Sequence, residues 1–201
     1  MSTNVLRDSL RQFAADSNSV NQLSLTALAH KLLNLPRLPT QQQLDRWLRG
    51  LDFTPGELAP FLSFRAGTYV RHRVCRGELA EMLVLCWRPG QRTAIHDHNG
   101  SLGAIRVCEG ELEEETFSFA PEGVVHPQTK SRRVRGEITG TDVPDVHRLG
   151  NSEGGGRDLV TVHIYAPPLK VIRTYRVGSA EVGTHVPADP VVVPLPTLSA
   201  R

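Results

Sequence analysis

The chain has 201 residues, of which 39% are hydrophobic and 22% are charged, and its formal net charge is +2 at pH 7. This length allows a sizeable core and favours one principal domain, while so small a charge argues against nucleic acid or a membrane surface as partner. No apolar run approaches the roughly 20 residues of a membrane-spanning helix, and the N-terminus lacks a signal-peptide pattern. We expect a cytoplasmic protein, either a monomer or a small homo-oligomer.

The first third of the chain has the apolar periodicity of helices. The periodic segments are residues 4–15, 23–33 and 41–51, followed by a shorter element after Thr54. Thr40 and Thr54 stand where N-caps are expected, and Pro55 fits the first helical position. Residues 1–66 are therefore predicted to form a helical segment packed on the remainder.

From residue 67 the pattern changes to short runs rich in β-formers, separated by glycine and proline. The predicted strands are 80–87, 104–108, 113–119, 136–139 and 159–166. Such spacing favours a sandwich or barrel over βαβ units, and we assign it to residues 67–185. Two stretches are expected to be less regular, the acidic run 111–115 as a solvated strand end or turn and 151–156 as a loop.

The last segment, 186–201, contains four prolines and cannot form a helix. We expect an extended arm that packs on the β-domain or is partly loose. Cys75, Cys86 and Cys108 show no C-x-x-C spacing and sit in apolar runs, which indicates buried free thiols in a reducing compartment.

The segment between Gly90 and Gly110 contains two histidines one residue apart, His96 and His98. On an extended chain alternate side chains point the same way, so both imidazoles can bind one metal ion. His147 in P-D-V-H-R-L-G-N is the candidate third ligand. His126 competes for this place, but its glycine and proline neighbours suit a loop; His30 and His185 are expected to be structural or solvated.

Three neutral imidazoles without a carboxylate leave a divalent ion its full charge and open coordination positions. This arrangement favours an anionic ligand such as a thiolate. The histidines alone do not choose the metal, because zinc binds the same set.

Two further segments place polar groups on one face of a strand. In T-V-H-I-Y a period of two places Thr161, His163 and Tyr165 on one face. In a barrel this face can line a ligand cavity, whereas on a half-buried strand it would simply be exposed to solvent. In Y-V-R, Tyr69 and Arg71 share a face, and a guanidinium fits a carboxylate with two hydrogen bonds. Arg73 and Arg106 are interpreted as ordinary solvated arginines.

Together these motifs resemble the cysteine dioxygenases, a family of the cupin superfamily. The resemblance spans about residues 69–168 and rests on I-H-D-H-N-G-S-L-G, V-C-E-G-E-L-E-E, V-H-R-L, T-V-H-I-Y-A-P-P and Y-V-R. Two departures are Thr161, where the family has serine, and Gly103, where cupins usually carry glutamate and animal relatives the cysteine of a thioether with tyrosine. No such crosslink is predicted here.

The resemblance implies a mainly β fold, a jelly-roll-like cupin β-barrel with an N-terminal helical cover. It also implies oxidation of L-cysteine by O2 to cysteine sulfinic acid at Fe(II). The implied residues are His96, His98 and His147 for the metal, Arg71 and Tyr69 for the substrate, and Tyr165, His163 and Thr161 for catalysis. The alternatives are a dioxygenase for 3-mercaptopropionate or mercaptosuccinate and, more distantly, a non-catalytic or isomerase-type metal-binding cupin.

Overall fold

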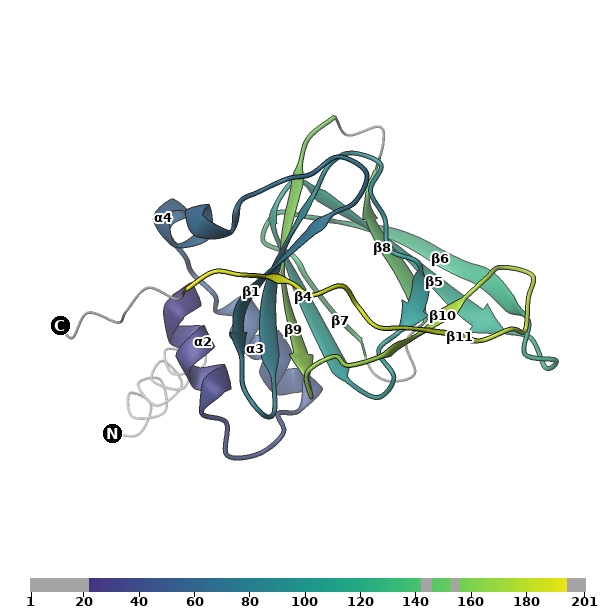
Figure 1. Ribbon diagram of the computed structural model, residues 1–201, viewed down its shortest axis with the longest axis horizontal. Coiled ribbons are helices and arrows are strands. Elements are labelled where there is room, and N and C mark those ends of the chain that lie inside the picture. The colour runs from purple at the N-terminus through teal and green to yellow at the C-terminus, as the bar shows by residue number, and fades with distance from the viewer. Residues whose placement is uncertain (1–21, 142–145, 153–155, 195–201) are drawn as a thin grey trace, which may run out of the picture.

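The computed structural model describes residues 22–141, 146–152 and 156–194. Two six-stranded β-sheets face each other, and a group of helices covers the outer side of one of them (Figure 1). The prediction of a mainly β protein with an N-terminal helical cover is confirmed. Within the described residues, however, hydrogen bonds do not join the two sheets into one closed barrel.

The first sheet has the strand order β12-β1-β2-β9-β4-β7. Its strands are β12 Val191–Val192, β1 Val70–Arg76, β2 Glu81–Trp87, β9 Leu159–Ala166, β4 Leu102–Glu109 and β7 Ile138–Thr141. The second sheet has the order β11-β10-β3-β8-β5-β6. Its strands are β11 Gly183–His185, β10 Ile172–Tyr175, β3 Ile95–Asp97, β8 His147–Asn151, β5 Glu111–Phe119 and β6 Val125–Val134.

The described helices are α2 Leu25–Leu33, α3 Gln41–Arg49, α4 Pro55–Leu58 and a 3₁₀ turn, η1 Ala59–Phe61. The predicted caps are confirmed, because Thr40 and Thr54 each form a capping box and Pro55 opens α4. In both boxes the threonine hydroxyl accepts a hydrogen bond from a backbone N–H in the first turn, which has no carbonyl partner within the helix. The predicted helix 4–15 lies outside the described residues.

The central strands β2 and β9 of the first sheet are buried on both faces. The outer face of this sheet packs on the helices through a cluster that includes Leu28, Leu44, Val84 and Ile164. Its inner face packs on the second sheet through a second cluster, with Leu83 and Leu85 of β2 against Leu112 and Leu149. All eight residues of β9 are therefore buried, and the polar residues that alternate along it face the interior between the sheets.

Three sequence-based assignments were wrong. The acidic run 111–115 is not a solvated strand end, since Glu113 and Glu114 on β5 are only 3% and 4% exposed. His126 lies on strand β6 rather than in a loop. Arg106 is no solvated arginine, because its guanidinium donates to the carbonyl oxygens of Leu48 and Arg49 at the end of α3. Tertiary contacts decide the environments of Glu114 and Arg106, whereas the pairing of β6 with β5 places His126 on a strand.

The described part of the C-terminal arm runs extended along the edge of the first sheet, beside β1 (yellow in Figure 1). Its strand β12 pairs in parallel with β1, with His72 opposite Val191. The carbonyl oxygen of Ala188 accepts a hydrogen bond of 2.6 Å from Nη1 of Arg71. Cys75, Cys86 and Cys108 are buried free thiols, as expected, and no described helix is long and apolar enough to cross a membrane.

We predict that Thr40→Ala lowers the free energy of unfolding by about 1 kcal/mol, because it removes the hydroxyl that accepts from the N–H of Gln43. Urea denaturation of both proteins measures the difference. Thr40→Ser keeps an acceptor and is expected to behave like the parent. Equal stability of the alanine variant and the parent would contradict the role of this cap.

Candidate metal centre

Three buried histidines meet between the sheets. His96 on β3 lies directly opposite His147 on β8 in the antiparallel register, and His98 follows β3 by one residue. Their candidate ligand nitrogens all lie within 4.8 Å of one another, and the residues His96, His98 and His147 are 5%, 4% and 0% exposed. The chelating pair and the third histidine predicted from the sequence are therefore brought together.

Hydrogen bonds at the rear of two of these rings indicate which nitrogen faces the centre. Nδ1 of His96 donates to the carbonyl oxygen of Ala94 at 3.0 Å, and Nδ1 of His147 donates to Oε1 of Glu114 at 2.9 Å. With the proton on Nδ1, each Nε2 keeps its lone pair, which is the form that binds a metal. The donor set thus fits a divalent ion.

His96 and His98 are neutral. Burial, followed by the neighbouring His147, lowers the pKa of His96 to about 3. Burial also holds the pKa of His98 well below its ordinary value. Uncharged imidazoles do not repel a cation, so a metal ion can replace their mutual contacts without first displacing protons.

Glu114 is a functional candidate that the sequence analysis missed. Its second oxygen accepts a hydrogen bond of 3.0 Å from the hydroxyl of Thr139. Burial by itself raises the pKa of Glu114, but the hydrogen bonds from His147 and Thr139 outweigh it, so the net pKa lies below its ordinary value and the carboxylate stays charged. A charged acceptor behind His147 orients the ring and increases the basicity of its Nε2.

Asp97, between the first two histidines, points away from them and fixes their strand. Its carboxylate accepts from Nη2 of Arg173 at 2.6 Å and from the hydroxyl of Tyr175 at 2.8 Å, both on the neighbouring strand β10. The ion pair fixes β3 against β10. It therefore also fixes the backbone that carries His96 and His98.

The polar face predicted on β9 is a continuous row of hydrogen bonds. Thr161 Oγ1 lies 2.8 Å from Nε2 of His163, and Nδ1 of His163 lies 3.1 Å from the hydroxyl of Tyr165. At the far end the indole Nε1 of Trp87 donates to Thr161 at 3.0 Å. The ring of Tyr165 lies 5.1 Å from that of His98, so the row ends at the metal centre.

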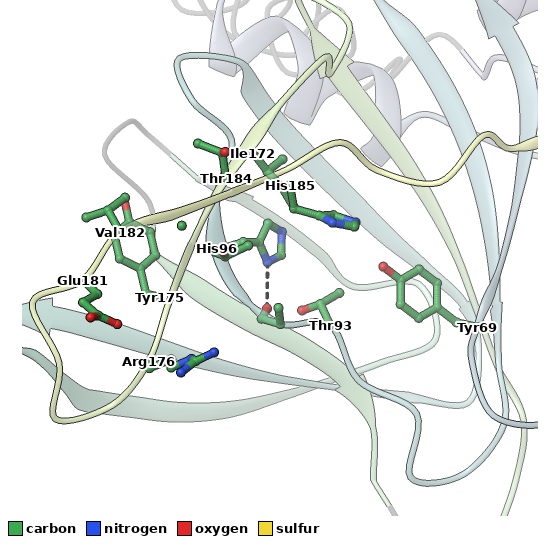
Figure 2. A pocket seen from close by; sticks show the side chains of 13 residues that line it. Tyr69, Thr93, His96, Ile172, Tyr175, Arg176, Glu181, Val182, Thr184 and His185 are labelled. Atoms are coloured by element: carbon green, nitrogen blue, oxygen red, sulfur yellow. Dashed lines mark hydrogen bonds between the residues drawn. The ribbon is translucent and has the colours of Figure 1, made fainter.

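Two adjoining cavities share Tyr69 in their lining, and the first of them borders this centre through His96. One, of about 730 Å³, is lined by His96, Thr93, Tyr175 and Tyr69 (Figure 2). The other, of about 430 Å³, is lined by Arg71, Ala188 and again Tyr69. His185 of β11 lines both and is exposed, which agrees with the prediction of a structural or solvated histidine.

Arg71 acts on the centre through its charge. Burial and then the charge of Arg71 lower the pKa of His163 to about 3. Tyr69 is placed by a stacking contact with Trp87, at 4.2 Å between ring centroids. The structure thus puts Arg71 and Tyr69 beside the histidines, on the side where the two cavities meet.

Gly103 explains how the centre accommodates His98 and Tyr165. A Cβ atom at this position would lie 3.0 Å from Cε1 of His98 and 3.6 Å from Cε1 of Tyr165. A larger side chain would therefore push the His98 ring. The position contributes neither a carboxylate ligand nor a sulfur atom next to the tyrosine.

The family model for cysteine dioxygenase type I matches residues 16–177. The chain belongs to this family. The predicted family and the predicted class of enzyme are confirmed. The family match includes all three histidines, the β9 row and the Tyr69–Arg71 segment.

Individual relatives are distant. Cysteine dioxygenase type 1 of Homo sapiens is 25% identical over 138 residues, covering 67% of this chain and 68% of that protein. The same enzyme of Danio rerio is 26% identical over 140 residues, covering 67% and 69%. Among solved structures, a protein with a double-stranded β-helix domain from Klebsiella pneumoniae is 21% identical, covers 64% of this chain and 87% of that one, and has a TM-score of 0.46.

We predict that Glu114→Gln weakens the binding of a divalent metal ion about 10-fold, because a neutral amide no longer increases the basicity of the His147 ring. Anaerobic titration of the metal-free protein measures the dissociation constant. Glu115→Gln is the matched control, since this neighbouring carboxylate pairs with Arg148 and not with a ligand. Unchanged affinity in Glu114→Gln would contradict the supporting role of the carboxylate.

Proposed function

We propose that the protein is a thiol dioxygenase that converts L-cysteine and O2 to cysteine sulfinic acid, with Fe(II) held by His96, His98 and His147. Both oxygen atoms of O2 are transferred to the substrate sulfur, so no further reductant is needed. The observation that carries the proposal is the buried cluster of three histidines, found in a chain of the cysteine dioxygenase type I family.

The choice of iron and of L-cysteine follows from the family and from the names of the relatives. When bound, ferrous iron supplies a Lewis acid that favours the thiolate form of the substrate and a centre that reacts with O2. The open coordination positions left by three neutral ligands are compatible with both.

Arg71 is proposed to hold the substrate carboxylate. A guanidinium has five N–H donors, and Ala188 uses one on Nη1, so the others can form a paired contact with a carboxylate. The bond to Ala188 also limits the rotation of the side chain. Tyr69, stacked on Trp87, would form the adjacent wall of the substrate cavity.

Tyr165 is proposed to donate a hydrogen bond at the reacting centre, oriented by His163 and Thr161. The 3.1 Å contact with His163 and the nearness of the His98 ring support this role. The buried free thiols are consistent with a reducing compartment, and we propose the cytoplasm.

Oxygen uptake by protein reconstituted anaerobically with Fe(II) tests the function. L-cysteine, 3-mercaptopropionate, mercaptosuccinate and cysteamine are supplied in parallel, and products are identified by mass. We expect the highest kcat/KM with L-cysteine and one O2 consumed for each sulfinic acid formed. A preference for another thiol would change the substrate and keep the iron site. No uptake with any thiol at full iron loading would contradict the enzyme and favour a metal-binding cupin.

We predict that Arg71→Gln raises the KM for L-cysteine about 30-fold, because charge-assisted hydrogen bonds to the carboxylate are lost. Steady-state oxygen uptake measures the change. Cysteamine has no carboxylate, so its KM should stay the same in this variant. Arg88→Gln removes an arginine that pairs with Asp158 at the surface and serves as the control. An unchanged KM for L-cysteine would remove Arg71 from the substrate site.

A further inference from the structure

Trp87 is the last residue of β2 and is fully buried at the end of the β9 row, but no motif in the sequence singled it out. Its Nε1 donates to Oγ1 of Thr161 at 3.0 Å. An indole N–H can donate a hydrogen bond and cannot accept one. Trp87 therefore differs from a water molecule or a hydroxyl group, either of which could donate or accept a hydrogen bond at this place.

The donor restricts the hydroxyl of Thr161. That group has one hydrogen and two lone pairs, and Trp87 occupies a lone pair. Within the described residues the side-chain partners of Oγ1 are Trp87 and His163. If His163 also donated to Oγ1, the threonine hydrogen would be buried without an acceptor, which is unfavourable. The hydroxyl therefore donates to Nε2 of His163.

The orientation of the Thr161 hydroxyl then determines which atoms donate in the remaining hydrogen bonds of the row. His163 is fully buried and neutral, with a pKa of about 3 caused by burial and then by the charge of Arg71, so only one ring nitrogen carries a proton. With Nε2 accepting from Thr161, the proton is on Nδ1, which donates to the hydroxyl oxygen of Tyr165. The Tyr165 hydrogen consequently points away from His163.

We propose that Trp87 is a positioning residue, which fixes one direction of the row Trp87, Thr161, His163 and Tyr165 so that the tyrosine acts as a donor at the metal centre. The direction itself is a property of the folded protein, whereas its catalytic consequence rests on the proposed dioxygenase function. The stacking of Trp87 on Tyr69 holds the indole plane and couples the row to the wall of the substrate cavity.

The histidine tautomer tests the direction without metal or substrate. Long-range proton–nitrogen correlation spectra of ¹⁵N-histidine-labelled, metal-free protein show which ring nitrogen carries the proton, and His163→Gln identifies the His163 signals. We expect a protonated Nδ1 and an unprotonated Nε2. The opposite tautomer in the parent protein would overturn the proposal, and this result needs no variant to fold.

Trp87→Phe tests whether the indole sets the direction. The phenyl ring keeps the stacking surface, while water that enters next to Thr161 can accept as well as donate. We expect the population of the opposite His163 tautomer to rise about fivefold, the effect of losing one ordinary hydrogen bond. Trp47→Phe is the matched control, because Trp47 lies on α3 and contacts Lys31 rather than the row. An unchanged tautomer ratio in Trp87→Phe would overturn the role of Trp87.

Turnover provides the second measurement. In iron-loaded Trp87→Phe we expect kcat for L-cysteine to fall about fivefold while KM changes less than about twofold, since Arg71 is untouched. A raised KM with unchanged kcat would place Trp87 in substrate binding instead and overturn the positioning role. Absence of turnover in the parent would contradict the dioxygenase function alone, because the tautomer is measured independently.

Discussion

One cross-strand pair, His96 opposite His147, joins parts of the chain about fifty residues apart at the centre of the second sheet. The antiparallel register of β3 and β8 places both side chains on the same face, and His98, one residue after β3, continues the alternation. Other contacts support this pair. Asp97 ties β3 to Arg173 of β10, and Glu114 of β5 holds the ring of His147. A shift of β8 by one residue would turn His147 to the other face and disperse the cluster.

The helical cover has a less direct effect on the site. Because helices α2 and α3 bury the outer face of the first sheet, β9 is excluded from water on both sides. Its polar residues then have only each other and the facing sheet as partners, which favours a single fixed arrangement of Thr161, His163 and Tyr165. Helix α3 also contacts the backbone next to His98 and Tyr165. The amide of Gln41 donates a hydrogen bond of 2.9 Å to the carbonyl oxygen of Gly103.

Much of this arrangement could be predicted from the sequence. The alternation of T-V-H-I-Y on β9 and the H-x-H spacing are local signals, and so are the threonine caps, which depend on residues three positions apart. The role of Glu114 could not be read from the same kind of pattern. A run of acidic residues is usually solvated, and only the pairing of β5 with β8 brings this one behind His147. A period of two from the buried Leu112 was the single local signal that pointed inward.

The hydrogen bond of Trp87 and the contact of the C-terminal arm with Arg71 could not be predicted, for the same reason. An apolar run ending in tryptophan indicates a core strand, and its hydrogen bond to Thr161 exists only because β2 lies beside β9. The contact of Ala188 with Arg71 likewise joins residues 117 positions apart. Long-range contacts of this kind determine which residues support the site, whereas the metal ligands themselves could be recognised from sequence motifs.

The central claim is that the three histidines hold iron and that the substrate thiolate binds to it. X-ray absorption at the iron edge, on protein loaded anaerobically with Fe(II), tests it most directly. We predict a shell of nitrogen and oxygen neighbours in the absence of substrate and, after addition of L-cysteine, one additional sulfur neighbour at a longer distance, because a metal–thiolate bond is longer than a metal–imidazole bond. Spectra that show only nitrogen and oxygen neighbours at saturating L-cysteine would contradict the account.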